Sequence, residues 1–156
     1  MKECMLLVLG FLVGQAAYAS EAKVSAIGKP FRVSHSVVRY CAQKPIVTMC
    51  EVFEPQMAEF LAESRDAKWA APMETRIAKS MLVDGKPWAE IRALECRRTR
   101  CALEYAVSID DLDHDVDGDA ELDRLMDPAG GVVVPEPPSD SGKGKMISVL
   151  IWRRRS

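Results

Sequence analysis

The sequence predicts an α+β protein in which an antiparallel sheet is covered by helices on one face, forming a two-layer sandwich. Three observations predict this class. Alternating residues over 91–109 are interrupted by a short polar connection with a cysteine at each end, which indicates a disulfide-braced hairpin. A helical stripe of large apolar residues lies within 66–81, and a strongly β-prone run covers 146–152.

The register of the hairpin follows from its two cysteines. Directly opposed residues of an antiparallel pair lie close together, and a disulfide can join a non-hydrogen-bonded pair. The expected partners are Cys96 with Cys101, Leu94 with Leu103, and Arg92 with Tyr105. Because side chains alternate between faces, the sulfurs share the core side with Leu103, Tyr105, Val107 and Ile109. The other side carries Ala102, Glu104, Ala106 and Ser108.

The residues before the hairpin predict an arm followed by helices. The arm covers 20–53, where 31–40 alternates as a strand and 46–53 is a second short strand or an extended segment. An α+β domain then covers 54–156 and opens with Pro55 at a first helical position.

A second helix is expected after a break at residues 64–66, with its cap at Asp66. Pro72 means that this helix either kinks or starts there. A stripe that recurs every four residues is typical of a core face, and we expect it to pack on the hairpin. Its members are Trp69, Met73, Ile77 and Met81.

The residues after the hairpin predict a short helix and two strands. The helix covers 122–126 and stops before Pro128. The strands cover 130–134 and 146–152, with a turn-rich loop between them.

The first nineteen residues predict an export signal. Lys2 precedes an apolar run over 5–13 that is too short to span a bilayer, and Ala17-Tyr18-Ala19 is a small-x-small cleavage site. Removal of residues 1–19 would take away Cys4, and no later stretch is apolar enough to cross a membrane. We therefore expect a periplasmic or secreted protein.

Four cysteines would remain after cleavage, and an even count in an exported chain favours disulfides over a metal site. Three connectivities are open. The sequential one, Cys41 with Cys50 and Cys96 with Cys101, is favoured because each pair flanks a short polar or proline-containing segment. Neither spacing is CxxC, so zinc is a poor alternative.

Two short basic clusters stand out against a net charge of −2, which gives no overall attraction to nucleic acid. One is the hairpin tip, read either as a solvated loop or as an anion contact. The other is the tail, which we expect to pair with the acidic segment 110–127 or to contact anionic envelope material. The clusters are Arg97, Arg98 and Arg100, and Arg153, Arg154 and Arg155.

Three motifs between residues 66 and 101 belong together: Asp66-x-x-Trp69-Ala70, Met73-Glu74, and Leu94-Glu95-Cys96-Arg97-x-Thr99-x-Cys101. This set resembles uncharacterised exported proteins of Gram-negative bacteria, in which a Trp-bearing helix precedes an ECRxTxC hairpin and a closing strand pair. The resemblance covers roughly residues 60–154, and the bridged hairpin turn is its most specific part. It implies a periplasmic address and an α+β arrangement, but no activity.

An acidic stretch matches the opening of a calcium-binding EF-hand loop, and its ligands would be Asp113, Asp115, Asp117, Asp119 and Glu121. Gly118 would permit the sharp turn. Arg124 occupies the position of the bidentate glutamate, so the site would be incomplete and its calcium affinity weak. The simpler interpretation is a solvated acidic turn, and no other cofactor is indicated.

No nucleophile motif, phosphate loop or free thiol is found. The sequence therefore favours a non-enzymatic module that binds a protein or an envelope component. The alternatives are a small carboxylate-dependent hydrolase or transferase and a weak calcium-binding protein. An enzyme would need two close, buried carboxylates with a raised pKa in a pocket. The candidates Glu95 and Glu104 are expected to face solvent or cross-strand arginines instead.

Overall fold

The computed structural model of the protein describes residues 30–43, 47–83, 85–111, 124–136 and 144–155. The helices α1 (His35–Gln43), α2 (Val47–Ala62) and α3 (Ala67–Ser80) are followed by a short hairpin of β1 (Leu82–Val83) and β2 (Lys86–Pro87), and a 3-10 turn covers Ile109–Asp111. The main sheet contains β3 (Glu90–Cys96), β4 (Arg100–Ser108), β5 (Met126–Pro135) and β6 (Lys145–Arg154). Its order is β3-β4-β6-β5, and all neighbours are antiparallel. The predicted α+β class and antiparallel sheet are confirmed.

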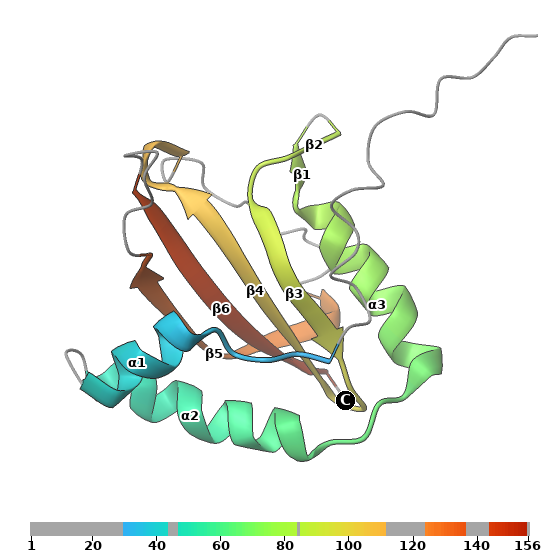
Figure 1. Ribbon diagram of the computed structural model, residues 1–156. Helices are drawn as coiled ribbons and strands as arrows, with labels where there is room; N and C mark the ends of the chain where they lie inside the picture. The colour runs from blue at the N-terminus through green and yellow to red at the C-terminus, as the bar shows by residue number, and fades with distance from the viewer. Residues whose placement is uncertain (1–29, 44–46, 84, 112–123, 137–143, 156) are drawn as a thin grey trace, which may run out of the picture.

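The helices cover both faces of the sheet, so the expectation of helices on one face is wrong in this respect. Helices α1 and α2 lie across one face, whereas α3 stands alongside β3 (Figure 1). The first core lies under α1 and α2, and its main members are Val37, Phe53, Met57, Phe60, Val132, Val149 and Ile151. The second core lies under α3, and its main members are Met73, Ile77, Leu94, Leu103, Val107 and Met126. Each face of the sheet therefore carries a buried core.

The hairpin register agrees with the prediction up to its open end. Cys96 lies opposite Cys101 and Leu94 opposite Leu103, but Ile91 takes the place opposite Tyr105 that was expected for Arg92. A register shift between Ile91 and Ala93 causes this difference, because a β-bulge inserts one extra residue into one strand of a pair.

The expected strands of the N-terminal arm are wrong. Residues 31–34 are extended, but residues 35–43 and 47–53 belong to α1 and α2. Val37 and Cys41 are four residues apart and both are buried, which is helical spacing rather than the spacing of two along a strand. Pro55 lies inside α2 instead of starting a helix.

Helix α3 follows the prediction closely. The Asp66 side chain caps it by accepting a hydrogen bond from the backbone N–H of Lys68 at 3.1 Å. The helix begins at Ala67 and continues through Pro72. Met73, Ile77 and Met81 are buried in the second core, and Trp69 packs against it.

The helix predicted over 122–126 is confirmed at residues 124 and 125, but Met126 is already the first residue of β5. Residues 122 and 123 lie outside the described part of the chain. Strand β5 is an edge strand, where proline is tolerated, and its register shifts between Pro128 and Gly130. The strands predicted over 130–134 and 146–152 are confirmed within β5 and β6.

Both predicted disulfides are confirmed. Cys41–Cys50 joins α1 to α2, and Cys96–Cys101 joins β3 to β4 at the tip of their hairpin. Within the described residues, no helix is both long and apolar enough to cross a membrane. The predicted export signal lies outside the described residues.

Replacing Cys41 and Cys50 together by serine should lower the free energy of unfolding by about 2–3 kcal/mol, because the bond closes a short loop in the unfolded chain. Urea unfolding of the oxidised protein and the double variant measures the difference. An unchanged unfolding midpoint would show that the bond between α1 and α2 contributes nothing to stability.

Candidate functional site

Two carboxylates that were expected to face solvent or cross-strand arginines are buried under the N-terminal segment. Glu95 and Glu104 are 7% and 3% exposed, because residues 31–34 and the first two helices cover this face of the hairpin. The backbone N–H of Phe31 donates to Glu95 Oε2 at 2.6 Å, and that of Ser34 donates to Glu104 Oε2 at 3.0 Å. These carboxylates hold an extended segment against the sheet.

Among the carboxyl groups of the described residues, that of Glu104 has a raised pKa. Burial raises the pKa of Glu104, while the hydrogen bond from Ser34 and the charge of Arg92 act against the shift. Neither Glu95 nor Glu104 lines the depression between α1 and α2 or the one on α3. Both carboxylates are buried and the pKa of Glu104 is raised, which meets part of the requirement for an acid/base couple.

The hairpin tip is not the solvated loop that was one of the two expectations. The guanidinium of Arg97 lies 4.7 Å from the centroid of the Phe60 ring, and its Nη1 donates to the Glu63 carbonyl at 3.0 Å. Arg97 Nε also donates to Glu95 at 3.1 Å. A cation at the end of a helix interacts favourably with the helix dipole, and α2 ends at Ala62.

Glu63 fastens the rest of the tip. Its carboxylate accepts hydrogen bonds from the Thr99 N–H at 2.7 Å, from the Thr99 hydroxyl, and from Arg100. Arg100 also pairs with the exposed Glu59. Burial opposes ionisation of Glu63, but the hydrogen bonds from Thr99 and Arg100 outweigh it, and the net effect is a lowered pKa.

A second ion pair joins the start of the hairpin tip to α3. Arg65 Nη2 donates to Glu74 Oε2 at 2.8 Å, and the Cys96 N–H donates to the other oxygen of Glu74 at 2.8 Å. Arg65 Nη1 donates to the Cys96 carbonyl at 3.1 Å. The carboxylate of Glu74 is 1% exposed, and the hydrogen bond to it raises the pKa of Arg65.

The arginine tail lies at the same end of the sheet as the hairpin tip, since Arg153 is paired in register with Arg100. Arg155 donates to Asp127 at 2.6 Å, so the expected pairing with the acidic segment is confirmed for this residue. The guanidinium of Arg154 lies 5.4 Å from the Trp69 ring. Arg98 and Arg153 are exposed, and an anion contact through them stays a prediction.

The predicted calcium ligands lie outside the described residues, and their geometry stays a prediction. Among the residues that the structure does describe, no group of three His, Cys, Asp or Glu side chains could hold a metal ion.

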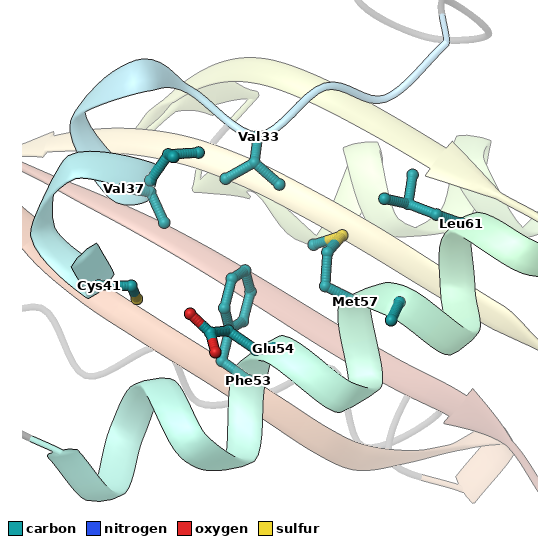
Figure 2. Close-up of a pocket in the computed structure, with 9 residues that line it drawn as sticks. Val33, Val37, Cys41, Phe53, Glu54, Met57 and Leu61 are labelled. Carbon is teal, nitrogen blue, oxygen red and sulfur yellow. The ribbon is translucent and has the colours of Figure 1, made fainter. Parts of the chain in front are cut away.

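An apolar groove with a volume of about 260 Å³ lies between α1 and α2. Figure 2 shows Val33, Val37 and Cys41 on one side of it and Phe53, Met57 and Leu61 on the other. The remaining lining residues are Val38, Glu54 and Ala58. The groove was not predicted, because residues 35–43, which form α1, were expected to belong to a strand and an extended arm.

Comparison of the chain with known protein families, with characterised proteins and with solved structures finds no match. The resemblance to exported Gram-negative proteins therefore stays a prediction.

Glu104→Gln should raise the free energy of unfolding at pH 7. Glutamine retains an acceptor for Ser34 and removes a charge whose burial is unfavourable. Because the folded-state pKa of Glu104 is raised, the folded wild type takes up its proton first as the pH falls. The advantage of the variant should therefore shrink towards pH 4.5, the ordinary pKa of this group. Urea unfolding across this range tests the sign, and a variant less stable than wild type at pH 7 would contradict it.

Glu63→Gln should lower the free energy of unfolding by about 1–3 kcal/mol, because it weakens hydrogen bonds to a largely buried charged group. Glu59→Gln is the matched control. It removes the same charge from a more exposed partner of the same Arg100 and should cost about 0–1 kcal/mol. Equal losses in urea unfolding would show that Glu63 has no special role at the tip.

Proposed function

We propose that the protein is an exported, non-enzymatic binding module that takes an apolar segment of a protein partner into the groove between α1 and α2. The observation that carries this proposal is the groove itself. Val38 and Leu61 border it and are 54% and 47% exposed, so large apolar side chains stand open to water beside an apolar hollow. Exposed apolar surface of this kind is typical of interaction sites.

The groove has rigid walls, which favours binding. Cys41, Phe53 and Met57 contribute to its lining and are also buried in the first core. The disulfide from Cys41 to Cys50 fixes the spacing of the two helices. A preformed site loses little conformational entropy on binding, so more of the contact energy remains as affinity.

The chemistry of the groove limits the class of partner. Eight of its nine lining residues are apolar or disulfide-bonded, and Glu54 is the single charged one. Helix α2 bears further exposed acids, Glu51 and Glu59, and contains no basic residue. We therefore infer an apolar segment flanked by at least one Lys or Arg.

Export supports this function by providing the compartment. The signal expected over residues 1–19 delivers the chain to an oxidising environment, where disulfides form and persist. A periplasmic or secreted address is thus consistent with the two disulfide bonds.

The carboxylate-enzyme alternative receives less support. Its best residues, Glu95 and Glu104, accept backbone hydrogen bonds from the covering segment, as a purely structural pair would. A general acid or base must come within hydrogen-bond reach of a substrate.

The test compares partner recovery by two double variants of the tagged, exported protein. Val38→Asp with Leu61→Asp places two charges in the groove. The matched control is Val52→Asp with Leu82→Asp. It also replaces one exposed valine and one exposed leucine, but neither residue lines the groove.

A protein retained by wild type should be retained by the control and lost by the groove variant, with at least a tenfold weaker affinity for the purified partner. Thermal unfolding should show that both variants are folded. Equal retention by the groove variant, equal loss by both variants, or no retained protein with wild type would each contradict the proposal.

A further inference from the structure

The outward side of α3 is cationic. Lys68 and Lys79 are exposed, and Arg76 is half-buried. The helix, all of whose residues are described, contains one acid, Glu74, which is buried and paired with Arg65. The charge that α3 presents to solvent is therefore positive.

A shallow depression on α3 combines this charge with an aromatic wall. Its volume is about 250 Å³, and it is lined by Lys68, Trp69, Pro72, Met73 and Arg76. Arg154 comes from β6, far away in the sequence, and places its guanidinium 5.4 Å from the Trp69 ring. Two separate segments thus contribute cations to one surface.

Two acids of the described residues lie near this surface, and both have partners. Asp66 caps the helix through the Lys68 N–H at 3.1 Å, and Asp127 is paired with Arg155 at 2.6 Å. Arg76 makes a further contact of its own, so the positive charge proposed to bind a ligand is that of Lys68, Lys79 and Arg154.

We propose that α3 docks the protein on an anionic lipid surface through Lys68, Lys79, Arg154 and Trp69. About 16 Å of helix axis separates Lys68 from Lys79, so a single phosphate or carboxylate cannot reach both. A field of head groups can. Lys and Arg near an anionic membrane each add about 1 kcal/mol of attraction, and tryptophan prefers the membrane–water interface.

The small side chains of the helix allow close approach to such a surface. Ala71 and Thr75 are exposed between Lys68 and Lys79, and the exposed Ala67 directly precedes Lys68. Lys68 and Trp69 border the same depression, so a basic and an aromatic side chain lie side by side on the outward side of α3. The groove between α1 and α2 belongs to the opposite face of the sheet and would stay accessible.

The experiment measures partition of the oxidised mature protein onto vesicles by sedimentation at low salt. Vesicles of phosphatidylglycerol mixed with phosphatidylcholine are compared with pure phosphatidylcholine. Lys68→Gln with Lys79→Gln should weaken partition by about 25-fold, at about fivefold per cation. The matched control, Arg32→Gln with Arg39→Gln, removes two exposed cations from the α1 side and should change partition little.

Fluorescence provides a second readout. The emission of Trp69 should shift to shorter wavelength on the anionic vesicles, and Trp69→Phe should abolish this shift while Trp88 and Trp152 remain. Added salt should reverse the partition because it screens exposed charges.

Three outcomes would overturn the proposal. They are an absence of partition on the anionic vesicles, equal weakening by the control pair, and equally tight binding of soluble heparin with the same loss in Lys68→Gln with Lys79→Gln. The last outcome would assign the surface to a soluble polyanion. All three are independent of the groove, so they leave the proposed protein-binding function untouched.

Discussion

The attachment of the α2–α3 connection to the hairpin tip is the constraint on which the rest of the structure depends. Residues 63–66 carry the chain from one face of the sheet to the other around this tip. Glu63 binds Thr99 and Arg100, the Ser64 carbonyl accepts the Arg98 N–H at 3.0 Å, and Arg65 reaches Cys96. Because the connection is held here, α2 is directed to one core and α3 to the other.

The Cys96–Cys101 bond supports this attachment from inside the sheet. The disulfide joins Cys96 covalently to β4. The Cys96 N–H also donates a charge-assisted hydrogen bond to Glu74, which joins the same residue to α3. A slip of one residue in the hairpin would turn Leu103 and Val107 away from α3 and bring Glu104 against its apolar side. The register of one hairpin thereby determines which side chains enter both cores.

The same contacts separate structural charges from those available for binding. Acids that are buried or largely buried pair with Arg65, Arg97 and Arg100, which form part of the architecture. The charges of α3 and the acids of α2 are left on opposite faces of one sheet. A binding module with a groove on one side and a basic surface on the other is consistent with this division, since neither surface needs the other to form.

The α+β class, the hairpin register next to its cysteines, both disulfides and the capped helix α3 could be predicted from the residues alone. These features depend on local rules: alternation of faces, a spacing of four residues, and side chains that cap a turn. The helical state of residues 35–43 and 47–53, the bulge at Arg92, and the burial of Glu95 and Glu104 depend instead on contacts between distant parts of the chain. A Glu on an alternating strand reads as solvent-facing. It becomes buried only when a segment more than sixty residues away supplies backbone donors, as Phe31 and Ser34 do. For the same reason the groove could not be predicted, because its walls come from two helices whose packing is set by contacts distant in the sequence.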